Sequence, residues 1–330
     1  MSVRCEPLAY RSQQVCEPRE LWMNGVDFYE EIEHGFKNYT GYGTEWIFFP
    51  DGAGIPHFVN LTMPSSIQLR SRQNKEIEYR LYTREISDYI ILDQSAQPPN
   101  GIDIRELLSN KPVKLVTHGW KSSADDSVVM GIKESYLKNK DVAVIGIDWS
   151  DTAKDYLYPL VAEYTGGVGA SVGQFLNTFC HLYNVSGGRM HLIGHSLGAH
   201  VMGIAASKTN VTIARITGKY TIIHLDKSLS LFRGERASIL NIPSSYISME
   251  LIVTWSFNGL LNFEEGGLDP ARPLFEFPKK PNALSLDASD AEFVDVIHSC
   301  SGVLGVQNPI GNVDYYPNSG TPPQPGWDHG

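Results

Sequence analysis

The amino-acid sequence predicts an α/β fold, with a mostly parallel β-sheet and helices on both of its faces. Two observations predict it. Short, uninterrupted apolar runs of strand length recur along the chain, and runs of helix length stand between them. Strands that are apolar on both faces are typical of a parallel sheet covered on both sides. In such sheets the functional groups belong at the carboxyl ends of the strands.

The alternation begins at residue 76. The predicted strands are EIEYRLYTRE (76–85), PVKLVTHGW (112–120), DVAVIGIDWS (141–150), RMHLIG (189–194), VTIARITG (211–218) and AEFVDVIHS (291–299). The predicted helices are SVVMGIKESYLKNK (127–140), residues 168–183 and LGAHVMGIAASK (197–208). Residues 1–75 are rich in Gly, Pro and aromatic residues and show little periodicity, so we expect an irregular N-terminal segment there.

Composition narrows the classes of partner. The net charge of −10 argues against a nucleic-acid ligand and gives no reason to expect adhesion to anionic membranes. No run of 18 apolar residues occurs, so no membrane span is predicted. The four cysteines form no C-x-x-C pair, so no zinc site is expected, and nothing in the sequence indicates another metal or an organic cofactor.

Several features bear on the compartment. Sequons begin at Asn38, Asn60, Asn184 and Asn210. Two cysteines, at positions 5 and 16, are close enough to close a small loop, and such a disulfide requires an oxidising compartment. The first 20 residues contain no apolar segment of a signal peptide. Either the protein is not secreted or its start lies upstream, and we favour the second alternative.

One short stretch predicts a nucleophile. The residues from Gly194 to Gly198 fit the pattern G-x-S-x-G, which in a nucleophile elbow places a serine between a strand and a helix. The pattern occurs again around Ser171, but two adjacent glycines stand before that serine in place of a strand. We therefore predict Ser196 as the nucleophile and Ser171 as a helix residue on a face notched by glycines.

The other predicted strand ends supply the remaining groups of a serine hydrolase. Asp269 lies in GLDPARP and is the candidate acid. The backbone N–H groups of Trp120 and Leu197 are the candidate oxyanion donors, since the first follows the turn after a buried strand and the second follows the nucleophile. His195 and His200 flank the nucleophile, but a base has to reach Ser196 from another loop, so we expect both to pack or cap.

Together these segments resemble the pancreatic-lipase family in its short, insect-type form without a C-terminal lipid-binding domain. The residues that carry the resemblance span roughly 76 to 326 and are VTHGW, VIGIDWS, LIGHSLGAHVMG, ARITG, GLDPARPLFE, LDASDAEFVDVIHS and GNVDYYPNSGTPPQPG. The resemblance implies an α/β-hydrolase fold in residues 76–330, secretion to the extracellular space, and hydrolysis of acylglycerol or phospholipid esters with transient contact to a lipid interface. It implies the same roles for Ser196, Asp269, Trp120 and Leu197.

The chain departs from the family in the spacing of two of these residues. In the family RITG runs directly into LDPARP, whereas here Ser196 and Asp269 are 73 positions apart. Removing residues 219–267, which is 49 residues, leaves 73 − 49 = 24 positions, the family spacing. One interpretation of this insert is a lid over a lipid site. The other, which we favour, is a retained intron, because the codons for Gly218-Lys219-Tyr220 and Gly266-Gly267 can encode donor-like and acceptor-like splice sites.

A second departure concerns the base. The family's histidine lies in a Cys-x-His segment beyond QPG, and this chain has Trp327 where that cysteine usually stands. His298 follows Asp269 in the right order, but the matching residue of the family is not the base, and His329 is next to the chain end. We expect the base to be missing from this chain. The loss of a triad member costs on the order of 10⁴ to 10⁶ in turnover.

Three functions follow as alternatives. The first is a secreted ester hydrolase that acts on lipids, and the second is a lipase-fold carrier or storage protein without catalysis, similar to insect yolk proteins. The third is an α/β-hydrolase peptidase, which GLDPARP and YPNSG fit less well. An intact elbow, oxyanion turn and acid favour the hydrolase.

Overall fold

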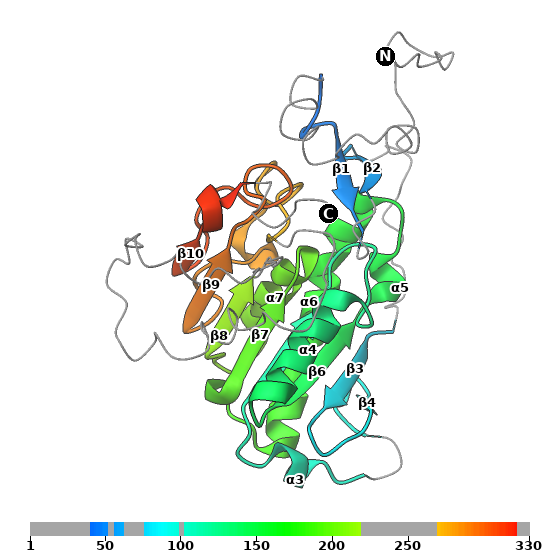
Figure 1. Cartoon of the computed structure of the whole chain (residues 1–330), viewed down its shortest axis with the longest axis vertical. Coiled ribbons are helices and arrows are strands. Elements are labelled where there is room, and N and C mark those ends of the chain that lie inside the picture. Colours follow the sequence, from blue (N-terminus) through cyan, green and yellow to red (C-terminus); the bar gives the residue numbers. More distant parts are fainter. Residues whose placement is uncertain (1–39, 52–55, 63–75, 99–101, 219–268, 322–330) are drawn as a thin grey trace, which may run out of the picture.

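The structure, a computed structural model, describes residues 40–51, 56–62, 76–98, 102–218 and 269–321. Its main sheet has the strand order β10-β9-β8-β7-β5-β6-β3-β4 (Figure 1). The strands of this sheet are β3 Glu78–Tyr82, β4 Ile90–Leu92, β5 Val113–Thr117, β6 Ala143–Asp148, β7 Met190–Gly194, β8 Arg215–Gly218, β9 Phe293–Ile297 and β10 Val313–Tyr315. Strands β5 to β10 pair in parallel, while β3 pairs antiparallel with both β4 and β6.

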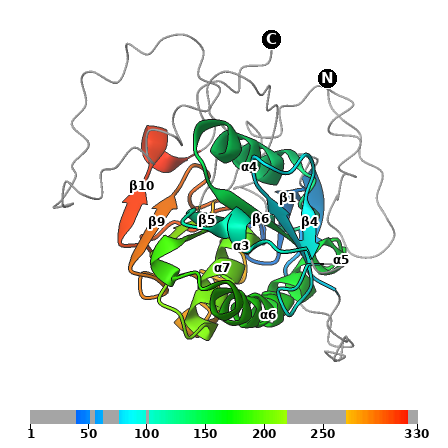
Figure 2. The same cartoon turned by 90° about the horizontal axis from the view of Figure 1, so that it is seen from below.

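Helices lie on both faces of the sheet, as Figure 2 shows in a view along the strands. Helix α4 (Ser127–Asn139) lies on one face, and α6 (Tyr158–Tyr183) and α7 (Leu197–Lys208) lie on the other. Two short helices, α3 (Arg105–Leu108) and α5 (Ser150–Ala153), complete the α-helices of the described residues. This mostly parallel, doubly covered sheet is the predicted α/β-hydrolase fold.

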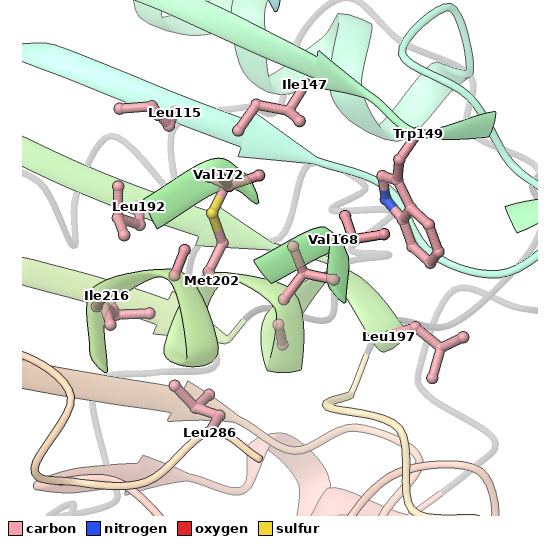
Figure 3. Close-up of a cluster of buried hydrophobic side chains, with 14 of the residues drawn as sticks. Leu115, Ile147, Trp149, Val168, Val172, Leu192, Leu197, Met202, Ile216 and Leu286 are labelled. Carbon is pink, nitrogen blue, oxygen red and sulfur yellow. The ribbon is translucent and has the colours of Figure 1, made fainter. Parts of the chain in front are cut away.

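The core explains why most positions of the strands are apolar. Leu115, Leu192 and Ile216 come from three adjacent strands and point toward α6 and α7, where they meet Val172 and Met202 (Figure 3). On the opposite face a smaller cluster under α4 holds the intervening residues, and it includes Val116, Val144 and Ile193. Successive side chains of a strand alternate between the faces, so burial of both faces requires apolar residues at successive positions.

Helix α6 starts earlier than the sequence predicted. We expected residues 168–183, whereas the helix begins at Tyr158, with a proline in its first turn, where the missing N–H costs nothing. Its interior glycines fit against α7: a Cβ at Gly169 would come within 2.7 Å of Ile204, and one at Gly173 within 2.8 Å of a backbone oxygen. Ser171 lies in this helix, as predicted, and not at an elbow.

The expected irregular N-terminal segment contains a β-hairpin. Strands β1 (Trp46–Pro50) and β2 (Pro56–Asn60) pair antiparallel, at the same end of the molecule as α5 (Figure 1). The hairpin packs through Phe49, whose ring lies 5.7 Å from that of Trp120 and 5.1 Å from that of Tyr158. Aromatic packing therefore orders part of a segment in which the sequence shows little periodicity. The domain boundary at residue 76 stays a prediction.

The predicted insert 219–267 lies outside the described residues, but its two flanks are described. A Cβ on Gly218, the last residue of β8, would lie 3.1 Å from Cγ of Pro270. Gly218 and Pro270, which flank the predicted insert, therefore lie next to each other in the fold. This proximity fits an insertion at a single position of the fold.

Three of the four sequons fall within the described residues, and Asn38 lies outside them. Asn60, Asn184 and Asn210 are all exposed, as is the Ser or Thr two positions after each. The last two sequons precede β7 and β8, at the amino edge of the sheet, and their loops touch: the N–H of Ala214 donates to the carbonyl of Gly187 at 3.1 Å.

Among the described helices none combines the length and the apolar character needed to cross a bilayer. Cys180 and Cys300 are buried free thiols. The small loop predicted between the cysteines at positions 5 and 16 lies outside the described residues.

Candidate active site

Ser196 lies in the turn between β7 and α7, and its backbone is strained. Its φ of 52° and ψ of −119° are values that residues other than glycine rarely adopt. Small residues permit the turn: a Cβ at Gly194 would lie 2.4 Å from Cα of Ala199, and a Cβ at Gly198 would lie 2.4 Å from the carbonyl oxygen of His118. This is the geometry of a nucleophile elbow, which raises the serine hydroxyl at the carboxyl end of the strand.

The hydroxyl of Ser196 is not held by another group, and no base contacts it among the described residues. Ser196 is 4 % exposed, and its Oγ has no hydrogen-bond partner in the described part of the chain. A serine hydroxyl needs a neighbouring base to lose its proton during attack.

The predicted oxyanion donors border this hydroxyl. Leu197 follows Ser196 at the first position of α7, where backbone N–H groups have no acceptor within the helix. The turn after β5 lies against the serine, since a Cβ at Gly119 would come within 3.2 Å of Ser196 Oγ. Neither the N–H of Leu197 nor that of Trp120 donates to a backbone acceptor among the described residues. Both donors are therefore available to an oxygen bound beside Ser196.

Asp269 lies beside the elbow and is held firmly. It is 2 % exposed, and its carboxylate accepts the N–H of Ser299 at 2.6 Å and that of Cys300 at 2.5 Å. Burial raises the pKa of Asp269 to about 7, against the lowering by the two N–H donors. Two residues later, the N–H of Ala271 donates to the carbonyl oxygen of Ser196 at 3.4 Å. The structure thus brings the predicted acid and the predicted nucleophile to one edge of the sheet.

His200 does not serve Ser196 but fixes the loop of Asp269. Its Nε2 lies 2.8 Å from the carbonyl oxygen of Ala271, its Nδ1 accepts the N–H of Leu286, and its ring stacks on Phe275. Burial lowers the pKa of His200 to about 3, so the ring is neutral. The expectation that this histidine packs is confirmed.

His195 and His298 are equally unsuited as the base. Burial lowers the pKa of His195 to about 3, and its buried Nδ1 has no partner among the described residues. His298 is fully buried, with Nδ1 2.9 Å from the carbonyl oxygen of Val306 and Nε2 2.7 Å from Asp314. Both nitrogens of His298 are engaged by these contacts, and among the described residues neither forms a hydrogen bond with Ser196 Oγ. His329 lies outside the described residues.

The structure also shows contacts that sequence reasoning missed. His118 and Trp149 stack with ring centroids 5.2 Å apart and form two hydrogen bonds at the turn after β5. Trp149 follows β6 directly, and residues 118–121 directly follow β5, the parallel neighbour of β6. An aromatic residue directly after a buried strand could have indicated a role for Trp149. Its partner His118 follows another strand, so the sequence around Trp149 does not indicate the pairing.

No cluster of three or more metal-binding side chains occurs among the described residues. The predicted oxyanion donors of this site, the N–H groups of Trp120 and Leu197, are backbone groups.

Comparisons with known proteins agree with this geometry. The family model described as Lipase matches residues 54–236 and 265–330, so the unmatched stretch falls within the predicted insert. Lipoprotein lipases of Bos taurus and Homo sapiens are each 34 % identical over 214 residues, which is 63 % of this chain and 34 % of theirs. The chain thus aligns with about a third of the length of these curated relatives.

Among solved structures, the esterase Est2 of Thermogutta terrifontis matches this chain at 9 % identity with a TM-score of 0.35. The match covers 72 % of this chain and 72 % of the esterase. That likeness is too slight to add to the argument. The family match covers most of the chain and includes the elbow, the oxyanion turn and Asp269. The chain therefore belongs to the lipase family.

Proposed function

We propose that this protein is an extracellular serine ester hydrolase of the short, insect-type lipase form, and that it acts on acylglycerol or phospholipid esters at a lipid interface. The observation that carries the proposal is the strained Ser196 between β7 and α7. A fold keeps such a conformation when the surrounding structure imposes it, and at an elbow the strain presents the hydroxyl to substrate. The lipid substrate follows from the family.

In the proposed reaction Ser196 Oγ attacks the ester carbonyl carbon, and its proton passes to a histidine. The carbonyl oxygen becomes an oxyanion and accepts the N–H groups of Trp120 and Leu197. The alcohol leaves with the proton. Water then attacks the acyl-serine and gives a proton to the histidine, and the fatty acid is released as that proton returns to Ser196 Oγ. Asp269 orients the histidine, which the described residues do not supply.

A second candidate function is a lipid carrier without catalysis. It is favoured by one observation, that within the described residues Ser196 Oγ has no histidine partner. Without its base, the serine would be slower by a factor on the order of 10⁴ or more. Lipid would then be bound and not cleaved.

A fluorophosphonate probe tests both candidates on the full chain. Ser196→Ala removes the only atom that the probe is expected to modify, and Ser171→Ala is the matched control in α6. A hydrolase predicts labelling of the wild type and of the control but not of Ser196→Ala. If the wild type stays unlabelled and still retains a fluorescent acylglycerol, the carrier is the better conclusion.

Substrate class is tested on emulsions of triacylglycerol and on phospholipid vesicles. Release of fatty acid that depends on Ser196 supports a lipid esterase. Cleavage of a peptide amide with no release of fatty acid would support the peptidase instead.

A further inference from the structure

We infer that the segment after β6, residues 149–155 including α5, acts as a clamp that fixes the proposed oxyanion turn, with Trp149 as a positioning residue for the donor at Trp120. The inference rests on the proposed hydrolase function. The turn after β5 consists of residues 118–121 and lies against Ser196 through Gly119. It belongs to no helix or strand, so its position depends on what holds it from behind.

The first pair of contacts comes from Trp149. Its backbone N–H donates to Nε2 of His118 at 3.1 Å, and its indole N–H donates to the carbonyl oxygen of His118 at 3.1 Å. The rings of His118 and Trp149 lie 10° from parallel. Nε2 also lies 3.5 Å from Oδ1 of Asp148, and Nδ1 lies 3.0 Å from the carbonyl oxygen of Gly119. His118 is thereby fixed at its backbone and at both ring nitrogens.

The second pair of contacts comes from the far end of the same segment. The N–H of Lys121 donates to the carbonyl oxygen of Ala153 at 2.9 Å, and the indole N–H of Trp120 donates to that of Asp155 at 2.9 Å. Residues 149–155 thus hold the turn by four hydrogen bonds, two before Trp120 and two at or after it. None of the four uses the backbone N–H of Trp120, which donates to no backbone acceptor among the described residues.

The arrangement matters because an oxyanion donor works by being in place before charge develops. A donor that has to move at the moment of reaction loses part of its effect. Trp120 and Trp149 are 2 % and 1 % exposed, so water does not compete for the clamp bonds. Loosening the clamp should slow bond formation at Ser196 without weakening the initial binding of a small reagent.

Trp149→Phe and Trp120→Phe test the inference on the full chain. Each keeps an aromatic ring and removes one indole N–H of the clamp. Trp46→Phe is the matched control, since its indole N–H also donates to a backbone carbonyl, that of Thr40 at 3.1 Å, and its ring contacts lie within the N-terminal hairpin region. The readout is phosphonylation of Ser196, separated into the maximal rate and the concentration for half-maximal rate.

We expect the maximal rate to fall about tenfold in both clamp variants, with an unchanged half-maximal concentration, and to stay at the wild-type value in Trp46→Phe. Amide hydrogen exchange provides a second readout, since the amide of Lys121 should exchange faster in Trp149→Phe. Equal maximal rates in Trp149→Phe and Trp46→Phe, or unchanged exchange, would overturn the clamp. An unlabelled wild type would overturn the hydrolase itself, and its exchange data would still show whether the turn is held.

Discussion

At position 196 the positive φ favours glycine, whereas the proposed chemistry needs the hydroxyl of serine. A positive φ costs a residue other than glycine about 1–3 kcal/mol. We predict that Ser196→Gly raises the free energy of unfolding by about 1 kcal/mol while abolishing phosphonylation. Ser171→Gly, inside α6, is the control and should lower it by about 0.5 kcal/mol. Urea denaturation measures both, and a less stable Ser196→Gly would contradict the strain.

The raised pKa of Asp269 predicts that the free energy of unfolding depends on pH. Burial raises its pKa to about 7 in the folded protein, above the value of about 3.9 for an unfolded chain. The folded state therefore holds this proton more tightly, so the stabilisation is complete below about pH 4 and is lost as the pH rises through 7. Urea denaturation at pH 5 and pH 8 should show a smaller loss in Asp269→Asn than in the wild type.

Asp290 is the comparison for this experiment, because burial also raises its pKa to about 7. Asp290→Asn should remove a separate share of the same pH dependence, because this carboxyl lies near Gly203 and Asp287 and not at the elbow. If the loss of stability between pH 5 and pH 8 is the same in Asp269→Asn as in the wild type, the carboxyl of Asp269 is already ionised at pH 5.

At the scale of elements, helix α6 provides a matched pair of glycines. A Cβ at Gly167 would meet nothing within 4 Å, whereas one at Gly169 would come within 2.7 Å of Ile204 in α7. Gly167→Ala should therefore stabilise the protein by about 0.5–1 kcal/mol through helix propensity. Gly169→Ala should destabilise it by about 1–3 kcal/mol, because the two helices would have to separate. Thermal midpoints that move in the same direction would contradict this packing.

Most of the sheet could be predicted from the sequence, because burial of both faces leaves apolar runs such as 143–147. The start of α6 could not, since Gly166 and Gly167 interrupt its pattern and the contacts that compensate for them come from other elements. The hairpin around Phe49 was missed for the same reason. Its order comes from aromatic contacts with Trp120 and Tyr158.

Part of the candidate site could likewise be predicted from the sequence, and part could not. Ser196 and Leu197 follow from local rules for a strand, a turn and a helix. The placement of Asp269 beside them was predicted from resemblance and from the spacing across the insert. The roles of His118 and Trp149 depend on contacts between two loops that are 31 positions apart in sequence. No local pattern contains that pairing.

At the scale of the whole molecule, the contact between Gly218 and Pro270 predicts the outcome of a deletion. Removing residues 219–267 should leave a chain that unfolds in one cooperative transition and is at least as stable as the wild type, since a shorter loop costs less entropy to close. Phosphonylation of Ser196 should persist. Circular dichroism and labelling measure the result, and loss of cooperative unfolding would show that the segment is needed for the fold.

The exposed sequons predict covalent modification if the proposed extracellular location is right. Expressed through a eukaryotic secretory pathway, the protein should carry glycans at Asn60, Asn184 and Asn210, because each acceptor amide and its hydroxyl partner are exposed. Mass spectrometry of tryptic peptides before and after enzymatic deglycosylation measures occupancy. Unmodified asparagines at all three positions would argue against passage through that pathway.

In an Asn60→Gln variant, which lacks the glycan of the N-terminal hairpin that packs on Trp120, glycans at Asn184 and Asn210 would also give the molecule a preferred orientation. Both positions are at the amino edge of the sheet, whereas Ser196 is at the carboxyl edge. A hydrated sugar chain resists transfer out of water, so the amino edge would stay in the aqueous phase when the protein adsorbs to an oil droplet. The carboxyl edge of the sheet, which carries the strained serine, would then face the droplet.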